Sequence, residues 1–186
     1  MIPLFVLIGI LLILVVWVAG VYNSLVTLRN RGDNAWADID VQLKRRHDLV
    51  PNLVETVKGY AAHERGTLED VTRARQQAVS LTGGTPEERA RAESQLSGML
   101  RSLFALSERY PQLRANENFL GLQASLQQIE EALQNARRYY NAVVRDFNIK
   151  VDVFPGNLVA RQLSFLKRQY FEIEDAAERA VPQVKF

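Results

Sequence analysis

An uninterrupted apolar run opens the chain. Residues 2–22 read IPLFVLIGILLILVVWVAGVY, and no charged side chain precedes Arg29. In a helix, about 20 such residues rise roughly 30 Å, which matches the hydrocarbon thickness of a bilayer. A cleaved signal peptide would have a basic start and a shorter run, whereas a buried core helix would have a polar face. The pattern therefore predicts a transmembrane anchor over residues 1–22, with Trp17 and Tyr22 as interfacial anchors.

Beyond this run the apolar positions repeat at helical spacing. Steps of three and four residues define three stripes: Trp36, Ile39, Leu43, Arg46, Val50, Leu53, Val57 and Tyr60; Ala92, Leu96, Met99, Leu103, Leu106 and Tyr110; Phe119, Leu122, Leu126, Ile129, Leu133, Ala136, Tyr140, Val143 and Phe147. Nowhere is an alternation of period two long enough to indicate a sheet. The pattern predicts an all-α protein.

Turn and capping residues predict where the helices begin and end. Thr85, Pro86 and Glu88 have the spacing of a capping box with proline at the first helical position. Other breaks and caps are predicted at Gly83-Gly84, at Pro111, at Asn116 or Asn118, and at Asn157 for a short helix beginning at Leu158. Pro51 lies inside the first soluble helix, where it is expected to produce a kink.

Helix lengths constrain the topology. A single helix over residues 23–81 would span roughly 90 Å, whereas residues 86–110 would return only about 37 Å. Either the first helix breaks near residues 63–67, or its exposed stripe packs on another subunit. We expect the break, and with it an N-terminal transmembrane helix followed by an up-and-down antiparallel four-helix bundle with long helices. The bundle would comprise residues 23–154, and a C-terminal segment, residues 155–186, would pack on the bundle or the membrane.

Charge and composition limit the partners and the chemistry. The 186 residues carry 23 basic and 21 acidic side chains, and this balance gives no reason to expect a nucleic-acid partner. Without cysteine there is no disulfide, thiolate zinc site or cysteine nucleophile. Cations follow the anchor at Arg29, Arg31 and residues 44–46, so the positive-inside rule places the N-terminus outside and the C-terminal domain in the cytoplasm.

Candidate catalytic residues are few. His47 and His63 share one predicted helical stretch, and a metal site there would need carboxylates from other helices, such as Glu117 or Asp146. We expect surface or capping histidines instead, and we expect Glu130 and its neighbour Glu131 to face solvent. Because no phosphate loop, nucleophile elbow or paired-carboxylate pattern is present, we expect no enzyme and no cofactor or metal.

Arg46 is the one charged residue in the first apolar stripe. If it is buried, a carboxylate must offset its desolvation, from Asp40, Asp48 or an acid on a facing helix. The residues around it form a candidate interaction or kink patch: Arg45, Arg46, Asp48, Pro51, Asn52 and Glu55. This patch either stabilises the kink or serves as a docking or oligomerisation surface.

A long motif in the first soluble helix resembles that of a known protein family. Residues 35–60 read AWADIDVQLKRRHDLVPNLVETVKGY, and later segments read RYYN from Arg138, DFN from Asp146, FPGN from Phe154 and YFE from Tyr170. On these residues the chain resembles the LemA family over its whole length. The resemblance implies a bacterial single-pass membrane protein whose soluble part is an up-and-down four-helix bundle, without an established biochemical activity. One departure is residues 163–170, which look more helical here than in the family.

These observations favour a membrane-anchored scaffold or adaptor at the bacterial inner membrane. Its expected partners are the lipid bilayer and either further copies of itself or other membrane proteins. Two alternatives remain open. One is a metal-dependent sensor or enzyme using His47 or His63, and the other is a membrane-remodelling protein that acts through the C-terminal segment.

Overall fold

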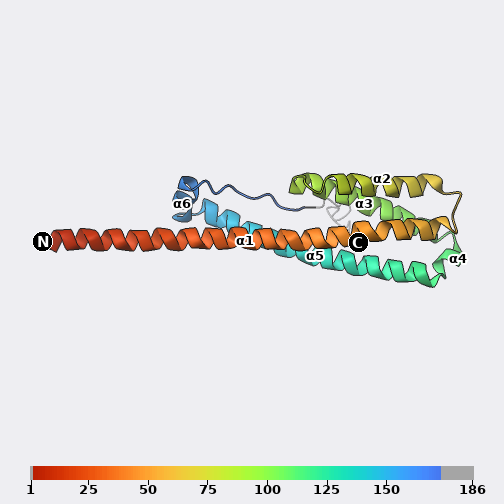
Figure 1. Cartoon of the computed structure of the whole chain (residues 1–186), viewed down its shortest axis with the longest axis horizontal. Helices are drawn as coiled ribbons and strands as arrows, with labels where there is room; N and C mark the ends of the chain where they lie inside the picture. Colours follow the sequence, from red (N-terminus) through yellow and green to blue (C-terminus); the bar gives the residue numbers. More distant parts are fainter. Residues whose placement is uncertain (1, 173–186) are drawn as a thin grey trace, which may run out of the picture. The chain divides into compact units, whose positions relative to one another are not determined.

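All regular structure in the computed structural model, which describes residues 2–172, is helical (Figure 1). The helices are α1 (Ile2–Lys58), α2 (Arg65–Ser80), α3 (Pro86–Ser107), α4 (Pro111–Arg114), α5 (Glu117–Asp152) and α6 (Gly156–Gln162). No strand occurs in this range, so the predicted all-α class is confirmed for it. The part of the predicted C-terminal segment beyond residue 172 lies outside the described residues.

The chain divides into two compact units. We call residues 2–38 with 136–170 the anchor unit, and residues 39–135 with 171–172 the core unit. The helices α1 and α5 each contribute residues to both units.

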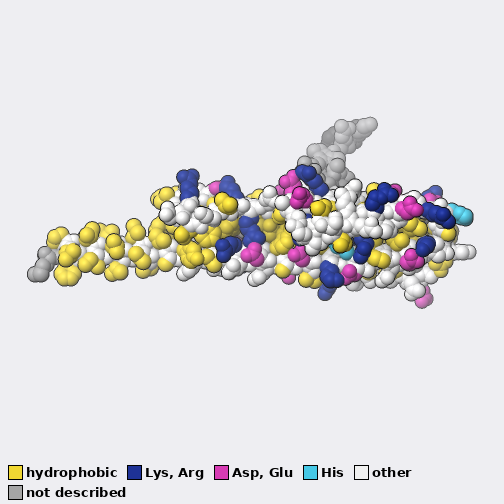
Figure 2. Space-filling model, turned by 45° about the horizontal axis from the view of Figure 1, so that its top comes forward, with side chains coloured by type: hydrophobic (Ala, Val, Ile, Leu, Met, Phe, Trp, Pro, Cys, Tyr) yellow, Lys and Arg dark blue, Asp and Glu magenta, His cyan; other side chains and the backbone are white. Residues whose placement is uncertain are grey.

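The N-terminal part of α1 is exposed and apolar. Its most apolar window is 6% buried, and among the described helices α1 alone is long and apolar enough to cross a membrane by length and composition. Figure 2 shows this stretch covered by hydrophobic side chains. Trp17 and Tyr22 are 39% and 43% exposed, and their interfacial role stays a prediction.

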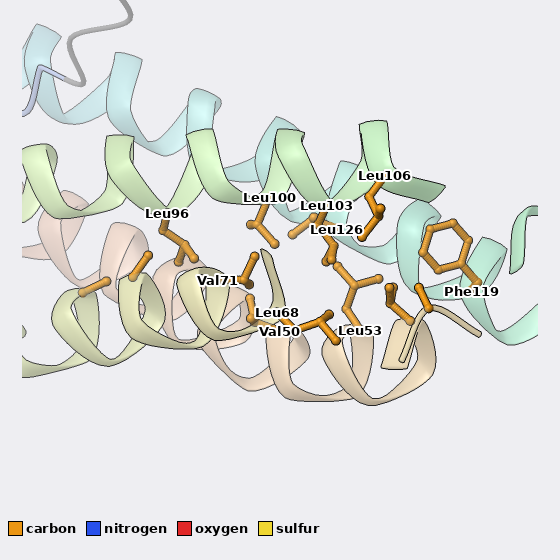
Figure 3. Packing of buried hydrophobic residues seen from close by; sticks show 14 of the residues in the cluster. Val50, Leu53, Leu68, Val71, Leu96, Leu100, Leu103, Leu106, Phe119 and Leu126 are labelled. Atoms are coloured by element: carbon orange, nitrogen blue, oxygen red, sulfur yellow. The ribbon is translucent and has the colours of Figure 1, made fainter. Parts of the chain in front are cut away.

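Five of the described helices supply side chains to the core unit's apolar interior, with Leu113 as the contribution of α4. Buried aliphatic and aromatic side chains from α1, α2, α3 and α5 point toward one another (Figure 3). The predicted stripes supply many of them, including Val50, Leu96, Leu103, Phe119 and Leu126. The stripe in α2, with Leu68 and Val71, completes the cluster. The periodicity of the sequence therefore identifies the buried faces correctly.

Local capping signals fix several helix ends. At α3, the Thr85 hydroxyl accepts from the Glu88 N–H and the Glu88 carboxylate accepts from the Thr85 N–H, so the predicted capping box is confirmed. The Thr85 hydrogen bonds also lower the pKa of Glu88. At α5, the Phe119 N–H donates to Asn116 Oδ1, which makes Asn116 rather than Asn118 the capping residue.

The break in the first helix comes earlier than the predicted position near Gly66. The helix α1 continues through Pro51 and ends at Lys58, directly before Gly59, and α2 begins at Arg65. Glycine has low helix propensity, and Ala61 just beyond it is 1% exposed, so the chain turns into the core at this point. In the core unit, α2 then runs back beside α1 (Figure 1).

In the anchor unit, α6 packs against α1 and α5. Val21 and Leu25 of α1 join Phe147, Val159 and Ala160 in one buried cluster. The rings of Tyr22 and Phe165 meet edge to face at 6.0 Å. Aromatic contacts of this kind add to the stabilisation that area burial gives.

Two predictions for this region are wrong. The helix α6 begins at Gly156, so Asn157 lies inside it and does not cap it. A Cβ at position 156 would stand 2.4 Å from the Lys150 carbonyl oxygen, so only glycine fits here. Beyond α6, Ser164 adopts a left-handed φ of 55° and the chain continues without helix, so residues 163–170 do not have the predicted helical character.

Candidate functional site

A charged residue lies at the centre of the core unit. The Arg46 side chain is 1% exposed. Its Nη1 donates to Glu93 Oε2 at 3.1 Å, and its Nη2 donates to the Ser97 hydroxyl at 2.5 Å. Its Nε lies 2.9 Å from Glu130 Oε1. Arg46 therefore joins α1 to both α3 and α5.

Glu93 receives a second partner from α1. Its Oε1 lies 2.7 Å from His47 Nε2, and both side chains are buried. The Arg75 Nε of α2 donates to the His47 carbonyl oxygen at 2.6 Å. We call Arg46, His47, Arg75, Glu93, Ser97 and Glu130 the ion-pair network, because together they connect α1, α2, α3 and α5.

This geometry resolves the three alternatives for the partner of Arg46. The partner is an acid on a facing helix, Glu93, which satisfies a buried guanidinium at short range. Asp40 pairs instead with Arg89 of α3, and Asp48 pairs with Lys44 one turn before it. The hydrogen bond from Lys44 lowers the pKa of Asp48, which stays at the surface.

The structure separates Arg46 from the rest of the predicted patch. Arg46 is buried, whereas the other five positions are exposed on α1: Arg45, Asp48, Pro51, Asn52 and Glu55. Glu55 pairs with Lys58, and the Asn52 carbonyl oxygen accepts from Thr56. A docking role for these exposed residues stays a prediction, and the buried arginine contributes to packing between helices.

Two predictions about titratable residues are wrong. His47 is 8% exposed rather than at the surface, because Glu93 offsets the cost of burying its ring nitrogen. Glu130 is half-buried and turns toward Arg46 rather than into solvent.

The two histidines also lie on different elements, since His63 is in the exposed connection after α1. Within residues 2–172, no group of three or more histidine, aspartate or glutamate side chains is arranged to hold a metal ion.

Sequence reasoning missed Glu93 and Ser97. A signal was present, because Arg89, Glu93, Leu96, Leu100 and Leu103 are spaced by three and four residues, and all are buried. Two opposite charges on one apolar stripe of α3 indicate that the facing helix carries charges too. Arg46 is the charge on the facing helix α1. Its pairing with Glu93, 47 positions away, is a tertiary contact without a local sequence pattern.

A second polar arrangement holds residues 165–170, which we call the strap. The side-chain amide of Asn148 grips the backbone of Arg168: Oδ1 accepts from the Arg168 N–H at 2.9 Å, and Nδ2 donates to its carbonyl oxygen at 3.0 Å. The Tyr140 hydroxyl donates to the Gln169 carbonyl oxygen at 2.9 Å. Burial raises the pKa of Tyr140, which keeps the phenol protonated as a donor.

The Arg168 side chain adds a polar contact between the strap and α1. Arg168 Nη1 donates to the Arg29 carbonyl oxygen at 3.0 Å and lies 2.7 Å from Asp33 Oδ1. The guanidinium crosses α1 at Gly32, where a Cβ would stand 3.1 Å from Nη1. The backbone bonds and this ion pair explain why the strap is not a helix.

Replacing Arg46 with methionine should destabilise the protein. The change leaves Glu93 and Glu130 without their arginine, and removing one partner of a buried pair costs about 3–5 kcal/mol. The double variant R46M/E93L should recover much of this loss, because apolar residues then replace the pair. Urea denaturation of the detergent-solubilised chain, followed by helical circular dichroism, measures both effects.

The matched control is Lys44→Met, which breaks the exposed pair with Asp48 and should change stability far less. A similar loss for the two single variants would contradict a structural role for Arg46. If Arg46 instead belongs to a docking surface, R46M changes the assembled mass while the stability stays the same.

Asn148→Asp should loosen the strap. Aspartate keeps the acceptor for the Arg168 N–H but cannot donate to its carbonyl oxygen, and a lost hydrogen bond of this kind costs about 1 kcal/mol. We expect faster amide exchange over residues 165–170, measured by mass spectrometry. The exposed neighbour Ile149 provides the control variant Ile149→Ala, which should leave exchange there unchanged. Equal protection in N148D and the parent chain would contradict the clamp.

Comparison with known proteins extends the resemblance seen in the sequence. The chain is 23% identical over 184 residues to magnetosome protein MamQ 2 of Paramagnetospirillum magneticum, covering 86% of this chain and 68% of that protein. It is 26% identical over 155 residues to protein LemA of Metamycoplasma hominis, covering 82% and 69%. No enzymatic activity is indicated by these matches. Because the model of the LemA family matches residues 35–186, the chain belongs to the LemA family, which has no established biochemical activity.

Proposed function

We propose that this protein is a membrane-anchored helical scaffold or adaptor that acts through self-association or through binding other membrane proteins. The observation that carries the proposal is the start of α1, which is charge-free and is 6% buried in its most apolar window. Such a surface needs lipid around it. The membrane we propose is the bacterial inner membrane, crossed once.

The finer architecture that we propose is an up-and-down antiparallel four-helix bundle with long helices. The ion-pair network and the apolar cluster both draw on α1, α2, α3 and α5, which supports this arrangement. Helices fixed to one another in this way present a surface of constant shape. A constant surface suits a scaffold, because little conformational entropy is lost when a partner binds.

The proposed scaffold should purify as an assembly. The chain of 186 residues has a mass of 21.1 kDa, so a homo-oligomer in mild detergent or in lipid nanodiscs should give a multiple of that mass. An adaptor should bring a second membrane protein in fixed stoichiometry. Native mass spectrometry distinguishes the two. A monomer without a stoichiometric partner in both environments would contradict the proposal.

We also propose that the N-terminus lies outside and the C-terminal domain in the cytoplasm. Because the chain has no cysteine, single cysteines report the side of the membrane without background. The exposed positions Pro3 and Gln95 are suitable. In intact spheroplasts, whose membrane keeps its native orientation, a membrane-impermeant maleimide should label Pro3→Cys. It should label Gln95→Cys only after permeabilisation. The opposite labelling pattern would reverse the orientation.

A further inference from the structure

Several large apolar side chains on and next to α6 are exposed in the anchor unit. Phe154 is 73% exposed, Leu158 is 56% exposed and Leu166 is 81% exposed, and Val153 beside them is also exposed. Val153 and Phe154 come from the turn between α5 and α6, Leu158 comes from α6, and Leu166 comes from the strap. We call them the α6 patch. An exposed apolar cluster of this kind indicates an interaction site.

The location of the patch selects its partner. Val159 and Ala160 of α6 pack against Val21 and Leu25 of α1, at the point where the predicted transmembrane segment ends. Figure 1 shows α6 alongside this part of α1. The edge-to-face contact of Phe165 with Tyr22, a predicted interfacial aromatic residue, fixes the start of the strap at the same level. The α6 patch therefore lies on the element that packs beside the end of the predicted transmembrane segment.

Basic side chains accompany the patch. Arg161 lies in α6 and is exposed, and Lys150 lies in the last turn of α5. No ion pair joins either cation to another residue of the described chain. Exposed apolar side chains beside basic ones are the composition of segments that lie in the membrane interface.

We propose that the α6 patch inserts into the interfacial layer of the same bilayer that α1 crosses. Phe154, Leu158 and Leu166 would enter the boundary between headgroups and acyl chains, and Arg161 would meet anionic headgroups. The inference rests on the membrane anchor of the proposed function. It adds a second contact with lipid, which sets the anchor unit against the membrane surface.

Depth-resolved fluorescence quenching tests the patch in the full chain. In two variants a single cysteine replaces Leu158 or Leu166 and is labelled with an environment-sensitive fluorophore. Each labelled variant is reconstituted into vesicles of phosphatidylcholine and phosphatidylglycerol. Quenchers are attached to the lipid either near the headgroup or near the end of the acyl chain. Leu14→Cys reports the anchor, and Tyr139→Cys, which is 54% exposed on α5 in the same unit, reports a position in water.

We expect blue-shifted emission at positions 158 and 166, with stronger quenching from the shallow quencher than from the deep one. The label at position 14 should respond to the deep quencher, and the label at position 139 to neither. If position 14 is quenched while 158 and 166 behave like 139, the interfacial contact is wrong and the anchor stands. A blue shift without lipid quenching would mean that protein covers the patch, which also overturns the inference. No quenching at position 14 would overturn the anchor and the inference together.

Discussion

The buried contact between Arg46 and Glu93 is the interaction on which the core unit depends. Both side chains are nearly inaccessible, so each has given up its water and must be satisfied by the other. Glu93 satisfies His47 with its second oxygen, and Arg46 reaches Glu130 with its remaining nitrogen. Three helices thus share one set of charges. If any of the three separated from the others, a charge would be left unpaired in the apolar interior.

This requirement restricts how the helices can slide. Apolar stripes of leucine and valine tolerate a shift along the axis, because one aliphatic side chain replaces another with little loss. A shift of one turn, about 5.4 Å, would separate the guanidinium from its carboxylates. The aliphatic cluster therefore supplies most of the buried area, and the network defines the register in which that area is buried.

The sequence predicted those features that depend on neighbours in the chain. The capping box at Thr85, the cap at Asn116 and the buried faces of α1, α3 and α5 all arise from spacings of three or four residues. The partner of Arg46 and the path of the strap could not be predicted in this way. Both depend on side chains that meet only after folding. In the strap these side chains bind backbone atoms, and bonds to backbone atoms leave no pattern of residue types in the sequence.

The clamp at Asn148 has a consequence for how this part of the chain can diverge. Its two hydrogen bonds, and the one from Tyr140, end on backbone atoms that every amino acid possesses except for the N–H of proline. An outward-facing position such as Gln169, which is held through its carbonyl oxygen, can therefore change without loosening the attachment. At such positions the constraint on sequence lies on Asn148 and Tyr140 of the helix that holds the strap, so the strap can acquire a new outer surface while Phe165 and Arg168 keep their contacts with α1.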